Sequence, residues 1–168
     1  RTESEGFRER TDQAVVFLEK AGSLLRGDRE PAETGTCTWL SVLRAEAAAS
    51  GKRMIFHVPE VLPMLEDAVS ETAERICREA AANAVRHGRA GRIDLFIRIL
   101  EDALQINVLD DGAGCGTIVK GYGLSGLEQA VGRLGGELDY GPMDPHGFAV
   151  RAVLPLTGAG MGGRTEHA

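Results

Sequence analysis

Two short apolar segments that favour a tight antiparallel hairpin constrain the fold of this chain most. The segments are residues 93–100 and 104–109, and only the polar stretch 101–103 separates them. So short a connection suits a hairpin turn, whereas parallel strands need a crossover of a dozen or more residues. The hairpin therefore argues against a doubly wound parallel sheet with helices on both faces.

Helix and strand patterns flank the hairpin on both sides. The clearest is a long amphipathic helix from about Leu62 to His87, which Gly88 would stop. Further helices are expected at Trp39–Ala49 and Leu124–Leu134, and further strands at Arg53–Val58, Glu137–Tyr140 and Phe148–Leu154. These elements predict an α/β fold: a two-layer sandwich whose mixed, mostly antiparallel sheet is covered on one face by helices.

Length and composition predict one principal domain with flanking segments. The chain has 168 residues, of which 43% are hydrophobic, enough for one good core. Residues 1–35 are interpreted as an amphipathic helix, at 7–25, followed by a linker, and residues 36–156 as the domain. Residues 157–168 contain four glycines and almost no apolar side chains, which predicts a disordered tail.

Charge and cysteine content argue against several classes of protein. The net charge of −6 gives no general electrostatic reason to bind nucleic acid or an anionic membrane. Cys37, Cys77 and Cys115 are an odd number without a close pair, which argues against a disulfide framework or a zinc knuckle and favours a reducing cytoplasm. No apolar run approaches the roughly 20 residues that span a bilayer. Since the chain begins at Arg1, we expect it to be a piece of a longer polypeptide.

Glu79 and Asn83 are the first candidate site residues. They lie one turn apart on the long helix and therefore face the same way. An amide oxygen suits one position around Mg²⁺, whose other positions take water and phosphate oxygens, and a carboxylate beside it could hold a water or accept a proton. Taken alone, such a pair is also typical of an exposed helix surface. His87, one turn further, could reach a phosphate or simply favour the helix dipole.

An acidic residue before a glycine turn forms the second candidate motif. Asp110 follows the apolar strand, while Gly112 and Gly114 would let the backbone approach a flat ligand. A carboxylate at this position could accept a hydrogen bond from the exocyclic amine of adenine, and it would reject guanine, which carries a carbonyl there. The alternative is an ordinary turn that ends a strand, for which Asp and Gly are common.

Glycines at the start of a helix form the third motif, Gly121-Tyr122-Gly123-Leu124-Ser125-Gly126-Leu127. Unpaired backbone N–H groups and the helix dipole favour phosphate at such a position. The preceding hairpin excludes a Rossmann unit, and no Gly-Lys-Ser/Thr follows for a Walker loop. The three motifs together predict a pocket for a nucleotide and a metal ion.

The order and spacing of the motifs resemble the ATP-binding domain shared by sensor histidine kinases, gyrase, Hsp90 and MutL, from about Arg53 to Leu156. The segment Cys77–His87 is similar to the N box of the histidine kinases that pair with response regulators of the nitrate/nitrite type. The segments Leu109–Gly114 and Gly121–Leu127 resemble the G1 and G2 boxes. Departures are Cys115 in place of a large apolar residue, a very short lid before Gly121, and Phe148 where Thr is common.

The resemblance implies roles for the candidate residues. Asn83 would bind Mg²⁺, Glu79 would stand in the N-box acid position, and Asp110 would bind the adenine amine. Gly112 and Gly114 would shape the base pocket. Gly121, Gly123 and Leu124 would hold the base of the lid and present N–H groups to phosphate.

The resemblance also implies a function. The chain would be the catalytic and ATP-binding domain of a cytoplasmic two-component histidine kinase, which transfers the γ-phosphoryl of ATP to a histidine of a dimerisation domain, for relay to a response regulator. None of the four histidines here has the setting of that phosphoacceptor. Residues 7–25 could be the second helix of the dimerisation hairpin, the full-length protein would be a homodimer, and this chain alone would not phosphorylate itself or contact a membrane. The alternatives are an anti-sigma-factor serine kinase and a nucleotide-sensing module without catalysis.

Overall fold

The computed structural model describes residues 38–87, 89–113 and 122–156, all within residues 34–168, the second of the two units into which the chain divides. In chain order the elements are α2 (Thr38–Ala49), β1 (Arg53–His57), α3 (Asp67–Arg86), β2 (Arg92–Leu100), β3 (Ala103–Asp110), α4 (Tyr122–Arg133), β4 (Glu137–Pro142) and β5 (Phe148–Pro155). The predicted helix at 7–25, the stop at Gly88 and the tail at 157–168 lie outside the described residues.

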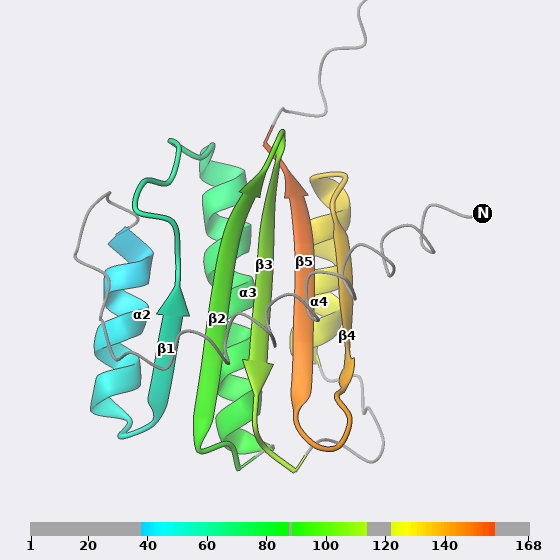
Figure 1. Cartoon of the computed structure of the whole chain (residues 1–168). Helices are drawn as coiled ribbons and strands as arrows, with labels where there is room; N and C mark the ends of the chain where they lie inside the picture. The colour runs from blue at the N-terminus through cyan, green and yellow to red at the C-terminus, as the bar shows by residue number, and fades with distance from the viewer. Residues whose placement is uncertain (1–37, 88, 114–121, 157–168) are drawn as a thin grey trace, which may run out of the picture. The chain divides into compact units, whose positions relative to one another are not determined.

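The strands form one five-stranded sheet in the order β1-β2-β3-β5-β4. The edge strand β1 pairs in parallel with β2, and the remaining neighbours pair antiparallel. The helices lie on one side of the sheet, and in the view of Figure 1 α3 and α4 are behind it. This arrangement confirms the predicted two-layer α/β fold with a mixed, mostly antiparallel sheet.

The predicted hairpin joins β2 to β3 at the centre of the sheet. Leu100 pairs with Ala103, so Glu101 and Asp102 alone form the loop, one residue less than the sequence predicted. Glu101 has a φ of 44°, as the first loop position of a tight hairpin turn requires.

Helix α3 begins later than predicted. The sequence suggested a start near Leu62, whereas the helix starts at Asp67, after Glu66 with its extended backbone at φ −60° and ψ 147°. Pro63 explains part of the difference, because a proline disfavours helical backbone in the residue before it. The helix ends at Arg86, and the N–H of His87 caps it by donating to the carbonyl oxygen of Asn83 at 2.9 Å.

The core forms where α3 packs on the sheet. One stripe of α3 is buried, at helical spacing: Val69, Thr72, Ala73, Ile76, Cys77, Ala80 and Ala84. Alternate residues of β3 belong to the same core, namely Leu104, Ile106 and Val108. Because side chains alternate along a strand, Asp110 points to the same, helix-bearing side of the sheet.

Several other residues have structural roles in the core and the sheet. Trp39 is buried and packs α2 into the core. Burial, aided by the charge of Glu74, raises the pKa of the Cys77 thiol, which therefore stays protonated inside the core. His57 stacks on Phe96 with ring centroids 4.2 Å apart. No described helix is long and apolar enough to cross a membrane.

Candidate functional site

The elements that carry the three motifs meet at one end of the sheet. Helix α3 and strand β3 both end there, and α4 begins there, at the lower end in Figure 1. Asp110 lies at the end of β3, opposite Ile93 at the start of β2 and Phe148 at the start of β5. Asp110 is thus flanked by a neighbouring strand on each side.

The first and third motifs touch where α3 and α4 cross. A Cβ atom added at Gly123 would overlap the carboxylate of Glu79, and one added at Gly126 would overlap the guanidinium of Arg75. The two helices therefore run in opposite directions, and the start of α4 lies toward the C-terminal end of α3. The glycine at position 123 leaves the space that the Glu79 side chain occupies.

Asn83 lies one turn beyond Glu79 and continues the row of α3 side chains that faces α4. It is half-buried, at the border of the apolar stripe, whereas His87 at the helix cap is exposed. The structure thus brings Glu79 and Asn83 to the end of the sheet that holds Asp110. Direct roles for Asn83 and His87 stay predictions.

Asp110 is a buried acid. The residue as a whole is 8% exposed, and its Oδ1 accepts a hydrogen bond from the N–H of Gly112 at 2.8 Å. Burial raises the pKa of Asp110 above its ordinary value, with the charge of Asp111 adding to the rise; the N–H groups of Gly112 and Phe148 act in the opposite direction. The position and burial of Asp110 make it a candidate functional acid.

The turn between β4 and β5 packs closely against the backbone of Asp110, a contact that the sequence did not predict. Gly147 has a φ of 101°, and a Cβ atom there would overlap the carbonyl oxygen of Asp110. The neighbouring His146 is exposed. Phe148, which replaces the common Thr, packs against the core. The only signal for Gly147 was a glycine in a turn, and its partner lies far away in the sequence.

The start of α4 is a further candidate for binding an anion. The first N–H groups of a helix have no partner within it, and those of Gly123 and Leu124 lie in this first turn. The Leu124 side chain is buried in the core and so fixes the helix in place. Gly112 is buried beside Asp110, whereas Gly114 and Gly121 lie outside the described residues.

The oxygen donors fit a magnesium ion that arrives with a ligand. Within the described residues, no three or more His, Cys, Asp or Glu side chains are grouped so as to hold a metal ion. Asn83 and Glu79 supply oxygen atoms, which suit Mg²⁺ rather than zinc. Since Mg²⁺ usually keeps several waters and binds substrate phosphates, one or two such donors are sufficient.

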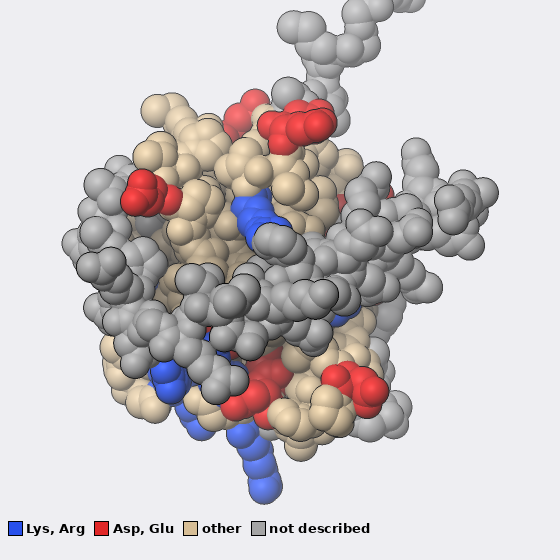
Figure 2. Space-filling view, viewed as in Figure 1, with Lys and Arg blue, Asp and Glu red and all other residues tan. Residues whose placement is uncertain are grey.

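Charges of both signs lie close together near this end of the molecule. In Figure 2 acidic and basic side chains alternate at the lower end of the face shown. The face shown is the one turned away from α3 and α4, so these charges are not those around the three motifs.

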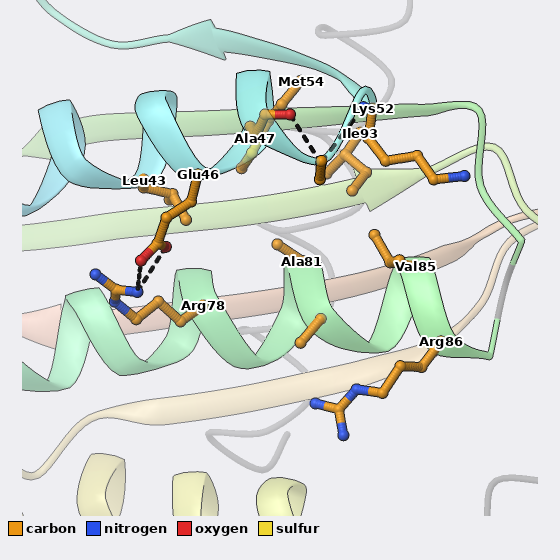
Figure 3. A pocket seen from close by; sticks show the side chains of 12 residues that line it. Leu43, Glu46, Ala47, Lys52, Met54, Arg78, Ala81, Val85, Arg86 and Ile93 are labelled. Atoms are coloured by element: carbon orange, nitrogen blue, oxygen red, sulfur yellow. Dashed lines mark hydrogen bonds and ion pairs between the residues drawn. The ribbon is translucent and has the colours of Figure 1, made fainter.

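A groove lies on another side of α3 and is lined in part by residues of the N-box segment, such as Ala81 and Ala82. It has a volume of about 410 Å³ and lies between α2 and α3 (Figure 3). Arg78 bridges Glu46 at 2.6 Å and Glu74 at 2.8 Å near one end, and Lys52 and Arg86 lie at its rim. No predicted site residue lines it.

Comparisons with known proteins all find similarity to histidine kinases or to the ATPase family that includes them. Residues 68–158 match the family described as histidine kinase-, DNA gyrase B- and HSP90-like ATPases. The chain is 34% identical over 88 residues to the sensor histidine kinase YxjM of Bacillus subtilis, covering 52% of this chain and 22% of that protein. It is also 34% identical over 96 residues to the signal transduction histidine-protein kinase/phosphatase UhpB of Salmonella typhimurium, covering 54% and 19%. The chain thus spans about a fifth of these relatives.

Solved structures share the fold. The histidine kinase domain of the blue-light activated kinase of Erythrobacter litoralis superimposes with a TM-score of 0.59 at 20% identity, covering 70% of this chain and 59% of that one. The mycobacterial sensor histidine kinase MprB superimposes with a TM-score of 0.54 at 21% identity, covering 71% of this chain and 91% of that one. At these identities the likeness concerns the fold.

Replacing Asp110 by Asn should stabilise the unliganded protein near neutral pH. Because the folded pKa is raised, the contribution of Asp110 to stability is fully present below about pH 3.9 and is lost as the pH rises through the folded pKa. Asn keeps an acceptor for the Gly112 N–H without the buried charge.

Thermal unfolding at about pH 7.5 and about pH 4 tests this expectation. The Asp110→Asn protein should have the higher Tm at the higher pH, with a smaller difference at the lower one. Asp102→Asn, which removes an exposed acid, is the control. A Tm below that of the unchanged protein near neutral pH would contradict the role of burial.

Proposed function

The chain belongs to the histidine kinase-, DNA gyrase B- and HSP90-like ATPase family, and on this basis we propose that the site at the end of β3 binds ATP with Mg²⁺. The observation that carries the proposal is the position of Asp110. It is a buried acid at the end of the central strand, on the helix-bearing side and at the end of the sheet where α3 ends and α4 begins.

Each part of ATP has a partner in this proposal. Asp110 accepts a hydrogen bond from the adenine amine, while Gly112 and Gly114 shape the base pocket. The N–H groups at the start of α4, with Gly121, Gly123 and Leu124, face the phosphates. His87 lies on the phosphate side.

The metal and the reacting phosphate belong to the α3 side of the proposed site. Asn83 holds Mg²⁺, which neutralises phosphate charge when bound. Glu79, positioned beside Gly123, orients a water or takes a proton from the attacking group. Orientation and charge stabilisation supply most of the rate of such phosphoryl transfers.

We further propose that the chain is the catalytic domain of a two-component sensor histidine kinase. The whole protein, a cytoplasmic or membrane-anchored homodimer, transfers the γ-phosphoryl to a histidine of its dimerisation domain, for relay to a response regulator. Support comes from the names of the relatives and from the N-box sequence Cys77–His87, which favours the nitrate/nitrite-type subgroup. The domain boundaries at 35/36 and 156/157 are part of this proposal.

Calorimetric titration with ATP tests the binding site. The unchanged chain should bind ATP more tightly with Mg²⁺ than without, and Asn83→Ala should lose this metal dependence. Asp110→Asn should weaken the binding of ATP by roughly tenfold and reduce the preference for ATP over GTP, because a charged acceptor is lost. Lys52→Ala, at the rim of the groove between α2 and α3, is the matched control. A chain that binds no ATP would contradict the proposal.

Replacing Gly123 by Ala tests the role of Glu79 in the protein extended upstream to its phosphoacceptor histidine. The added Cβ displaces the Glu79 carboxylate, the far end of a flexible side chain, so the fold should persist. Transfer of radiolabelled phosphate to histidine should fall by roughly a hundredfold. Gly132→Ala, in the same helix but facing open space, should also keep the fold and should not lose phosphate transfer.

Equal phosphorylation rates in the two alanine variants would show that Glu79 takes no part. Labelling of a serine in place of the histidine would favour the anti-sigma-factor type of kinase. ATP binding without labelling of any acceptor would favour a sensing module.

A further inference from the structure

We propose that Asp111 is a positioning residue of the nucleotide site, whose carboxylate holds the turn after β3 against the chain that leaves α3. The inference rests on the proposed function and deepens it. It assigns a role to the residue next to Asp110, to which neither the motif pattern nor the comparisons give one.

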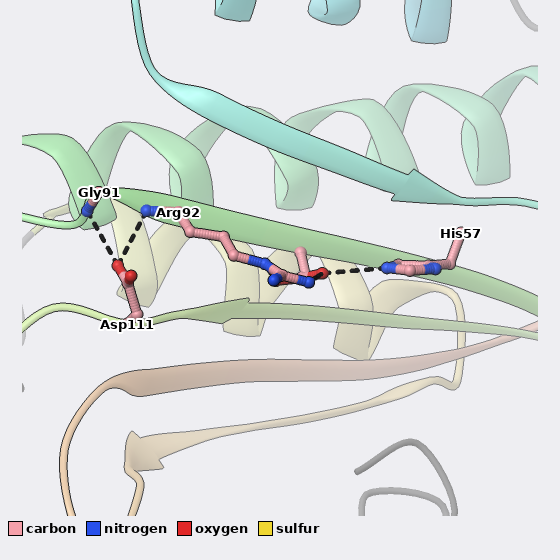
Figure 4. A network of polar contacts seen from close by, with 5 residues as sticks. His57, Gly91, Arg92 and Asp111 are labelled. Carbon is pink, nitrogen blue, oxygen red and sulfur yellow. Dashed lines mark hydrogen bonds and ion pairs between the residues drawn. The ribbon is translucent and has the colours of Figure 1, made fainter. Parts of the chain in front are cut away.

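The carboxylate of Asp111 binds the backbone at the start of β2. Its Oδ1 accepts hydrogen bonds from the N–H groups of Gly91 and Arg92, both at 2.9 Å, as Figure 4 shows. The N–H of Asp111 in turn donates to the carbonyl oxygen of Arg92 at 3.2 Å. The last pair of the ladder between β2 and β3 is Ile93 with Asp110, so these bonds hold the chain just beyond it.

The same bonds reach the end of α3 that carries Asn83. The N–H of Ala90 donates to the carbonyl oxygen of Ala84 at 3.2 Å, and Ala90 is fully buried. Ala84 directly follows Asn83, and Ala90 directly precedes Gly91. A short chain of backbone contacts therefore connects the proposed metal ligand to Asp111 and through it to Asp110.

This connection fixes the two sides of the site relative to each other. ATP must contact Asp110 with its base and the end of α3 with its phosphates and metal. If the separation of these two groups is set before binding, less ordering is needed when ATP binds, and the affinity is higher. Asp111 is thus expected to act on ATP through the placement of Asp110.

The side chain of Arg92 takes no part in this connection. Its guanidinium binds Asp94, at 2.6 Å and 2.8 Å, and Asp94 also binds His57 at 3.0 Å. Asp111 instead uses the backbone N–H of Arg92. Arg92→Ala therefore removes a charge near Asp111 but keeps the donor, which makes it a matched control.

Titration with ATP and Mg²⁺, and separately with GTP and Mg²⁺, tests the proposal on the whole chain. Asp111→Ala removes the acceptor and Asp111→Glu displaces it, so both should bind ATP roughly tenfold more weakly and lose part of the preference for ATP over GTP. Asp111→Asn keeps an acceptor oxygen and should stay within about threefold of the unchanged chain, as should Arg92→Ala.

The outcomes separate a positioning role from a merely structural or electrostatic one. If Asp111 only stabilised the fold, its loss would weaken the binding of ATP and GTP equally. If its charge were what matters, Asp111→Asn would weaken ATP binding as much as Asp111→Ala. Either result overturns the proposal, as does unchanged ATP binding in the Ala and Glu variants. If the Ala variant does not fold, the Glu and Asn variants still decide. An unchanged chain that binds no ATP refutes the proposed function itself, so the two failures are distinguishable.

Discussion

The packing of α3 on the helix-bearing face of β3 is the interaction on which the rest of the structure depends. The buried stripe of the helix follows a spacing that lets it lie against Leu104, Ile106 and Val108 along its length. Asp110 is the last residue on that face of β3, and α3 ends at the same end of the sheet. A single apolar contact thus brings together side chains that are far apart in the sequence.

The end of β3 combines two acids with different tasks. Asp110 turns into the layer of the helices, where burial raises its pKa, whereas Asp111 turns to the backbone at the start of β2. Among the described residues no basic side chain pairs with Asp110, so its burial costs folding free energy, and proteins commonly retain such a cost where a ligand needs the group. In our proposal Asp111 holds Asp110 in the position in which it can contact the nucleotide.

Patterns within single segments were readable from the sequence, and contacts between segments were not. Two apolar segments and the short connection at Glu101 predicted the hairpin, and Asp110 was predicted directly after its second strand. The predicted start of α3 was wrong because the apolar pattern also includes Leu62 and Leu65, which pack on the core without being helical. Gly147 and Asp111 act on backbone atoms of remote segments, which no local pattern encodes.

The central claim is that one site at the end of β3 holds both ends of ATP. A crystal structure of the chain with Mg²⁺ and a non-hydrolysable ATP analogue tests it most directly. The account predicts the adenine amine within hydrogen-bond distance of the Asp110 carboxylate and the metal beside the Asn83 amide. An analogue bound in the groove between α2 and α3, with Asp110 and Asn83 untouched, would contradict it.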